Sequence, residues 1–386
     1  MALYFTRNTR VFLQQGTSGT VFEIPVLDGF SFSQATNSSS ISLNESLKSR
    51  DGASKRSRKV FNDSYAPAEW SFSTYMRPFL SQNGTTNGWE DSGSQDRCHA
   101  VEEALWANFV ADNTFTESSG ADESVWADGI TTSTSNMIVD FTGSEKGKLG
   151  EFNLYFIFNE ATDKVYKISK CCVNEATIDF DIDGIATIQW SGFGRDISDE
   201  EASAPTVDIT EAINKTNNFI RNRLTTLTVS ANDTADFIGD TADDNFGVTL
   251  TGGSLSFNNN ITFLTPESLG RVDKPFAHVP GTREVSGSFT AYLDNTANST
   301  ESLVQQLVDQ DKSINNSFDL DFSIGGSAAP KVEIALPRCH LELPVHQIED
   351  VVSVEFNFHA LPSDFDPVDA DEFEAKITYT GTTYPA

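Results

Sequence analysis

The sequence predicts a mainly β protein with two tandem β-sandwich or barrel-like domains of one fold, each flanked by one amphipathic helix. Three observations lead to this prediction. Several segments of the first half recur in the same order in the second half, and many segments alternate apolar and polar residues. The composition is also rich in Phe, Ser, Thr, Asn and Asp, which favours strands and turns over helical bundles.

The repeat is centred on residues 69–76 and 286–293, where Phe72 and Tyr75 have the same spacing as Phe289 and Tyr292. Four flanking matches keep the same order: 5–8 with 219–222, 44–47 with 266–269, 103–110 with 301–308, and 139–141 with 320–322. A separation this long excludes a solenoid and predicts two whole domains. We expect a first domain at 1–194, a linker at 195–213, a second domain at 214–361 and a C-terminal extension at 362–386.

Local periodicity predicts the main elements. Residues 103–110 and 301–308 have apolar side chains at helical spacing, so each should form a helix that packs across a sheet. Residues 177–183 alternate strictly, which predicts a strand with Ile178, Phe180 and Ile182 on the core side and three aspartates on the other. Residues 318–322 have the same alternation, and the chain is expected to end in a short strand at 375–379.

The charge is strongly acidic, with a formal net charge of −30. This argues against a nucleic-acid-binding surface, because contacts with phosphates need clustered Lys and Arg. The basic residues of segment 49–62 are Arg50, Lys55, Arg56, Arg58 and Lys59. The segment lies between predicted strands and should form an exposed, extended loop. It is either a solvated loop or an arm that docks on an acidic surface, for which another copy of the chain is the best partner.

The cysteines and the apolar segments bear on the compartment. Cys98, Cys171, Cys172 and Cys339 form no C-x-x-C pair, so we expect buried, reduced thiols. No apolar run approaches the roughly 20 residues of a membrane span, and the first residues lack the layout of a signal peptide. These features predict a soluble protein made in a cytoplasm.

The known catalytic and metal-binding motifs are not matched. Residues 179–184 begin like a calcium-binding loop, but Trp190 stands where that loop needs a carboxylate. The five histidines form no H-E-x-x-H motif, and G-x-S-x-G does not occur. We therefore predict no catalytic residues, no metal site and no cofactor. A glycosidase pair of carboxylates stays open as an alternative, because such a pair is defined in space and not in sequence.

The arrangement of these segments resembles the tail tube proteins (major tail proteins) of long-tailed bacteriophages, in the version with a duplicated tube domain. The resemblance is carried by 29–33, 70–76, 103–110 and 190–194, with counterparts at 253–257, 286–293, 301–308 and 356–360. The second copy departs from the pattern because 356–360 lacks the glycines of 190–194. The resemblance implies a structural virion protein of the phage tail, not an enzyme, made in the cytoplasm of a host bacterium.

The resemblance also implies an assembly. Six tube domains close a ring in this family, so a duplicated chain would need three copies, and the trimeric rings would stack into a hollow tube for DNA ejection. Tape measure, terminator and baseplate proteins would be further partners, and double-stranded DNA would pass through without binding. An acidic lumen suits that passage, because carboxylates repel phosphates.

Two sets of residues are predicted to serve these roles. The lumen-facing set is Asp140, Asp179, Asp181, Asp319 and Asp321. The inter-ring set is the basic segment Arg50, Lys55, Arg56, Arg58 and Lys59, together with Arg271, Lys274 and Arg283 as its shorter second-copy equivalent. The alternative functions are a tail terminator, a capsid decoration protein, a carbohydrate-binding adhesin or a β-sandwich glycosidase.

Overall fold

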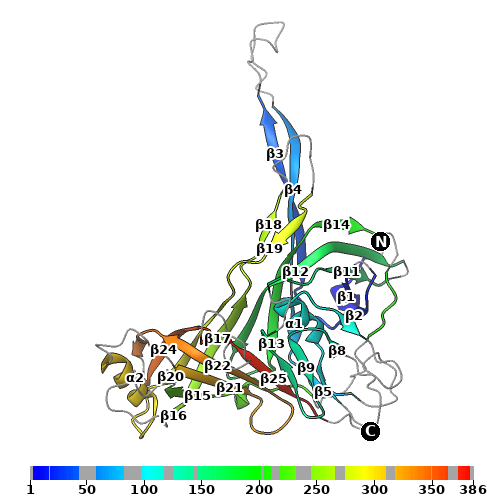
Figure 1. Ribbon diagram of the computed structural model, residues 1–386. Helices are drawn as coiled ribbons and strands as arrows, with labels where there is room; N and C mark the ends of the chain where they lie inside the picture. Colours follow the sequence, from blue (N-terminus) through cyan, green and yellow to red (C-terminus); the bar gives the residue numbers. More distant parts are fainter. Residues whose placement is uncertain are drawn as a thin grey trace, which may run out of the picture.

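A computed structural model describes residues 3–16, 18–42, 58–81, 97–116, 125–142, 147–160, 162–200, 204–209, 218–231, 245–265, 274–309, 318–348, 350–363 and 373–382. It confirms the mainly β class, since antiparallel ladders make up most of the described chain. Figure 1 shows two lobes joined by shared strands, with a long hairpin projecting from the body.

The first half of the chain forms two sheets that share one strand. Strands β2, β1, β11, the first part of β12 and β14 make one sheet, and the second part of β12, with β13, β4 and β3, makes the other. Their bounds are β1 Thr9–Gln15, β2 Val21–Ile24, β3 Ser31–Ile41, β4 Lys59–Tyr75, β11 Phe152–Phe158, β12 Lys164–Phe180, β13 Thr187–Gly194 and β14 Asp196–Asp199.

The second half forms its sheets in the same order. Strands β16, β15, β21, the first part of β22 and β25 make one sheet, and β23, β24, β20 and β17 make the other. Their bounds are β15 Thr226–Ala231, β16 Asn245–Val248, β17 Leu250–Asn258, β20 Glu284–Tyr292, β21 Phe318–Ile324, β22 Lys331–Leu341, β23 Val345–Ile348, β24 Val352–Ala360 and β25 Lys376–Thr380. Strand β25 confirms the short strand predicted at the end of the chain.

The remaining elements are short. The helices are α1 Glu103–Val110 and α2 Thr300–Asp309, as predicted, and 3-10 turns at η1 Thr6–Asn8 and η3 Asn222–Leu224 precede β1 and β15. The side chains of Leu105 and Phe109 are fully buried, and α1 packs against β12 and β10. The short strands are β5 Pro78–Leu80, β6 Cys98–Ala100, β7 Phe115–Thr116, β8 Val125–Trp126, β9 Ile130–Thr132, β10 Met137–Val139, β18 Thr262–Leu264 and β19 Ala277–Val279.

The two halves match in ladder register as well as in strand order. Phe72 of β4 lies opposite Trp190 of β13, and Phe289 of β20 lies opposite Phe356 of β24. The bulge between β11 and β12 falls where Phe152 opposes Cys171, and the bulge between β21 and β22 falls where Phe318 opposes Cys339. In both places the thiol lies near the carbonyl three residues earlier. All four cysteines are buried and free.

The two halves are joined by strands on both sides of the core. The second part of β12 pairs with β17, which makes one continuous sheet from both halves. Strand β25 pairs with β22 of the second half and with β10 of the first. Aromatic side chains fill the space between: Trp106 contacts Trp190 and Phe257, with ring centroids 4.9 and 5.5 Å apart. The halves therefore share one hydrophobic core.

Three local predictions need correction. The strand predicted at 177–183 ends at Phe180, so Ile182 is 49% exposed in a turn and does not face the core. Residues 59–62, expected in a loop, belong to β4, because the β3–β4 ladder continues to Lys59. Finally, residues 320–322 do not correspond to 139–141. Strand β21 pairs with β15 and β22, as β11 pairs with β1 and β12, so β11 is its counterpart.

Candidate functional site

The most distinctive surface is one face of the continuous sheet β3–β4–β13–β12–β17–β20–β24–β23, to which each half contributes four strands. Paired residues of an antiparallel sheet point to the same side, so the registers define rows that cross it. One row is Ser73, Gln189, Thr177, Ser256, Ser286 and His359. Another is Ser31, Ser71, Ser191, Glu175, Asn258 and Glu284. We call this the polar face.

The opposite face of the same sheet is apolar and buried. Its corresponding rows are Phe72, Trp190, Ala176, Phe257, Val285 and Ala360, and Ile188, Ile178, Leu255, Gly287 and Phe358. Gly287 leaves room for a neighbour: an added Cβ would come within 2.7 Å of the Phe358 ring. The strict alternation arises because successive side chains of a strand point to opposite faces. The core therefore anchors the sheet and leaves the polar face in water.

The charge of the polar face has one sign. The face carries the carboxylates Glu69, Glu175, Asp179, Glu284 and Glu355, and neither row contains a Lys or an Arg. Short-range hydrogen bonds hold several of its groups: Ser256 donates to Glu175 at 3.1 Å, and Gln347 Nε2 donates to Glu355 at 3.1 Å. Ser31 and Ser71 are joined at 2.8 Å between their hydroxyls. The result is a hydroxyl-rich, anionic surface.

The hairpin of β3 and β4 extends well beyond the polar face and forms the projection in Figure 1. Outside the sheet its residues are almost all exposed, including Ser38, Ser39, Arg58 and Lys59. Hydrogen bonds across the two strands, such as Asn37 Nδ2 to the Ser64 hydroxyl at 3.0 Å, hold it together. The second half carries the shorter hairpin β18–β19 between β17 and β20, in the place that the extension has between β3 and β4.

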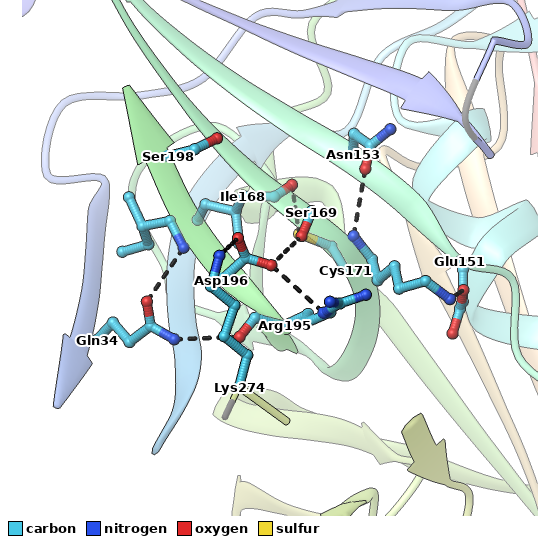
Figure 2. A network of polar contacts seen from close by, with 12 residues as sticks. Gln34, Glu151, Asn153, Ile168, Ser169, Cys171, Arg195, Asp196, Ser198 and Lys274 are labelled. Atoms are coloured by element: carbon cyan, nitrogen blue, oxygen red, sulfur yellow. Dashed lines mark hydrogen bonds and ion pairs between the residues drawn. The ribbon is translucent and has the colours of Figure 1, made fainter. Parts of the chain in front are cut away.

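A polar network fastens the loop around β18–β19 to the first half (Figure 2). Lys274 Nζ lies 2.8 Å from Asp196 of β14, which also accepts a hydrogen bond from Ser169 at 2.6 Å. Glu151 lies 2.7 Å from Lys170 Nζ and 3.6 Å from Nδ1 of His278. Contacts with His278 and Lys170 lower the pKa of Glu151 to about 2.

This network predicts an acid-sensitive contribution to stability. The pKa of Glu151 is lower in the folded chain than the ordinary 4.5, so its stabilisation is present above about pH 4.5 and is lost as the pH falls towards 2. At pH 7 the free energy of unfolding of the Glu151→Gln variant should be about 1 kcal/mol lower than that of the unsubstituted chain, after allowance for solvent screening. This deficit should vanish near pH 2. Denaturant titrations at several pH values measure this, with exposed Glu160→Gln as control. A deficit that does not depend on pH would contradict the assignment.

Comparison with known proteins identifies the family. The family model described as phage tail tube protein matches residues 26–360, which is most of the chain. The chain belongs to the phage tail tube protein family. It is also 29% identical over 396 residues to "Tail tube protein pb6" of Escherichia phage T5, a match that covers 99% of this chain and 78% of that protein.

Membership of this family confirms several predictions. The chain is a structural protein of the virion tail that assembles with itself into a tube, and its family is not known for enzymatic activity.

Neither described helix is long and apolar enough to cross a membrane. Within the described ranges, no group of three or more His, Cys, Asp or Glu side chains has the arrangement of a metal site.

The predicted lumen-facing aspartates of this tail tube protein do not share one surface. Asp179 is exposed on the polar face. Asp181 is also exposed, but it lies in the turn after β12, where it accepts a hydrogen bond from Ile182 N at 2.6 Å. Asp140 is 9% exposed and accepts hydrogen bonds from the backbone and hydroxyl of Thr142 at 3.0 and 2.5 Å, so it holds a turn.

Asp319 and Asp321 lie on a different sheet from Asp179. Their strand, β21, packs its apolar side on the core: the Phe322 ring stacks on Phe180 at 5.1 Å. The two aspartates therefore point away from the polar face, on the far side of the second layer. Partial burial and the charge of Asp321 raise the pKa of Asp319 to about 6, and burial together with the charge of Glu333 raises the pKa of Asp321.

The predicted inter-ring residues are also divided. Arg50, Lys55, Arg56 and Arg271 lie outside the described residues. Arg58 and Lys59 are exposed on the β3–β4 hairpin, and Lys274 pairs with Asp196 of the same chain. Arg283 is mostly buried, 3.5 Å from Glu374 and stacked over the Phe141 ring at 3.7 Å. Two of the described positions, Arg58 and Lys59, are therefore free for a contact between molecules.

Sequence reasoning missed four carboxylates of the polar face, Glu69, Glu175, Glu284 and Glu355. The available signal was the spacing of hydroxyls against aromatics, as in Ser71-Phe72-Ser73 and Ser288-Phe289-Thr290. Each pattern assigns its own strand a polar side. Glutamates at even spacing from these serines and threonines lie on the same polar side, so the pattern would have identified them. Choosing aspartates from the strands with the clearest alternation did not.

Proposed function

We propose that three chains close into a ring of the tail tube, with the polar face of each chain lining a hollow lumen. The observation that carries this proposal is the sheet of eight strands, half from each half of the chain, with an anionic face and a buried apolar face. A wall of a water-filled bore needs such a two-sided sheet. Rings stacked face to face would then form the tube through which the genome is ejected.

The proposal includes an internal duplication. Two tube domains in one chain explain why strand order, bulges and the aromatic pairs Phe72–Trp190 and Phe289–Phe356 recur in both halves. The first domain is residues 1–194 extended by β14, which pairs with β12, and the second domain is residues 214–361. The C-terminal extension 362–386 supplies β25, which fastens the second domain to the first. Six domains per ring correspond to three chains with pseudo-sixfold symmetry.

An anionic lumen suits the passage of DNA. Double-stranded DNA carries about one negative charge for every 1.7 Å of its axis, so a wall with Lys or Arg would hold it by releasing counterions. Glu175, Asp179 and Glu284 repel phosphate instead, and the serine and threonine hydroxyls keep the wall hydrated. DNA would pass without binding. Tape measure, terminator and baseplate proteins are the further partners that this function implies.

The β3–β4 hairpin is proposed to join one ring to the next. It projects from the body and carries the basic segment, including Arg58 and Lys59, on a chain with a net charge of −30. Opposite charge favours contact with an acidic surface of the adjoining ring and guides its approach.

Charge reversal tests the hairpin. The variant Arg58→Glu with Lys59→Glu should abolish tubes while the monomer keeps its circular dichroism spectrum, because both side chains are exposed in the isolated chain. Arg7→Glu, which places a reversed charge on η1, should still polymerise. Tubes of normal length and yield from the double variant would contradict the assignment.

Electron cryomicroscopy of the polymerised protein tests the proposal as a whole. Stacked rings should be visible, each with three chains, an inner wall of eight strands per chain and the polar face towards the bore. A ring of any other number of chains, or a polar face on the outer surface, would overturn it.

A further inference from the structure

A cluster of buried ionisable groups lies between the start of α1 and strand β25. Glu102, just before the helix, and Glu103, its first residue, are both fully buried. Three further groups of the cluster are mostly or fully buried: Arg77 before β5, His99 of β6 and Tyr379 of β25. Glutamates are almost never fully buried without partners, so each of the two calls for an account of its partners.

The side chain of Glu103 is well satisfied. Its Oε1 accepts a hydrogen bond of 2.7 Å from Nε1 of Trp126. Its Oε2 accepts a hydrogen bond of 3.2 Å from the backbone N–H of Ala100 and lies 3.0 Å from Nδ1 of His99. These contacts compensate for the water that Glu103 loses on burial.

Glu102 has far fewer partners. Its Oε2 accepts one long hydrogen bond, 3.4 Å, from the backbone N–H of Arg77. Its Oε1 is buried and has no hydrogen-bond partner among the described residues. The carboxyl also interacts with the hydroxyl of Tyr379, which accepts a hydrogen bond of 2.8 Å from Trp106. A buried carboxyl with so few donors is costly when it is ionised and much less so when it is neutral.

Loss of hydration dominates the titration of Glu102. Burial raises its pKa from 4.5 to about 7, although its interactions with Tyr379 and Arg77 favour the ionised form. Burial also raises the pKa of Cys98 to about 12, so this neighbouring thiol stays neutral. The remaining ionisable groups of the cluster are Glu103 on α1 and His99 on β6.

Strand β25 covers this cluster. It has five residues, and its ladder with β10 consists of three residue pairs. The thiol of Cys98 lies beneath it, 3.5 Å from the backbone oxygen of Tyr379. Short elements open locally at a lower cost than the unfolding of a whole domain. Opening of β25 would admit water to Glu102 and would separate β10 of the first half from β22 of the second.

We propose that Glu102 is a proton-operated latch on β25. While the carboxyl keeps its proton, the neutral group is stable beneath the strand, and β25 joins β10 to β22. When the proton leaves for the solvent, the buried charge favours the open strand, because water then solvates the oxygen that lacks a donor. The junction of β12 and β17 is unaffected. This inference concerns a single chain and does not depend on the proposed ring.

The pH range follows from the two states of the strand. With β25 open, the pKa of Glu102 returns to the ordinary 4.5, and with β25 closed it is about 7. The stabilisation of the closed strand is therefore complete below about pH 4.5 and is lost as the pH rises to about 7. Above that pH the group is ionised in both states, so opening no longer depends on its titration.

Thiol labelling measures the opening. A pyridyl disulfide reagent, which reacts with thiols even in weak acid, should reach Cys98 only when β25 has moved. Cys171 is the internal reference, because it is buried in the ladder of β11 and β12, which β25 does not join. In the unsubstituted chain the ratio of the Cys98 rate to the Cys171 rate should rise at least about tenfold between pH 5 and pH 7. Mass spectrometry of the labelled peptides gives both rates.

The matched variant is Glu102→Gln, because the amide has nearly the shape of the protonated carboxyl and carries no charge at any pH. Its ratio should stay constant over the same range. Circular dichroism in weak acid checks that the variant folds, and the ratio in the unsubstituted chain tests the latch even if it does not.

Three outcomes would overturn the latch. The first is a constant ratio in the unsubstituted chain, and the second is an equal rise in the Glu102→Gln variant. The third is equal acceleration of Cys98 and Cys171, which would mean that the whole chain unfolds and not β25 alone.

Discussion

Replacement of Trp106 by alanine is expected to lower the free energy of unfolding by about 3–5 kcal/mol, the usual cost of emptying a site of this size in a packed core. Trp106 is fully buried on α1 and contacts Trp190 of the first half and Phe257 of the second. Its Nε1 donates a hydrogen bond of 2.8 Å to the hydroxyl of Tyr379 on β25. The variant therefore loses contacts that join both halves and leaves a buried hydroxyl without its donor.

Denaturant unfolding followed by circular dichroism measures this loss. Trp106→Phe is the matched control, because it keeps an aromatic ring but lacks the N–H donor, and it should lose only about 1–2 kcal/mol. Because Trp106 bridges the halves, we also expect the alanine variant to broaden the transition or divide it in two. A loss below about 1 kcal/mol would show that the site collapses around the missing ring.

Reversal of charge on the polar face should give the largest functional change. The variant Glu175→Lys with Asp179→Lys replaces two anions of β12 on the polar face, with the row of Thr177 between them, by cations. Tubes should still assemble, since both side chains lie outside the apolar core. The cations should then hold linear double-stranded DNA inside the tube at about 50 mM salt and release it near 200 mM, because such binding falls steeply with salt.

A comparison of linear with closed circular DNA shows whether the DNA binds inside or outside the tube. A closed circular plasmid cannot thread into a bore, so it should not compete with linear DNA for tubes of this variant. The control Asp319→Lys with Asp321→Lys makes the same charge change on the second layer and should bind linear and circular DNA alike. Equal competition by circular DNA in the Glu175 and Asp179 variant would place those residues on the outside of the tube and contradict the proposed lumen.

Much of the fold could be predicted from local patterns. The two helices, the aromatic strands around Phe72 and Phe289, and the closing strand near Tyr379 depend on side-chain spacing, which is visible in the sequence. The bounds of long strands were harder. The ladder of β3 and β4 continues to Lys59 through a segment with few apolar residues. Hydrogen bonds between the two strands hold this part of the hairpin together, rather than burial of apolar side chains.

The polar face was predicted only in part, for a related reason. Alternation assigns each strand an apolar and a polar side, and Asp179 was correctly given to the polar side of β12. It does not tell which layer a strand joins. Asp319 and Asp321 alternate just as clearly, yet β21 lies in the second layer, so their polar side faces away from that of Asp179.

The sequence by itself determined the mainly β class, the recurrence of segments in the two halves and the amphipathic helices, because these depend on residue type and spacing along the chain. Tertiary structure alone decided that β12 pairs with β17 as well as with β13, that β25 joins β22 to β10, and that β3 and β23 are the outer strands of the sheet of eight strands. Those outcomes depend on hydrogen bonds between residues far apart in the chain, and a periodic pattern carries no information about which distant strand will supply the partner.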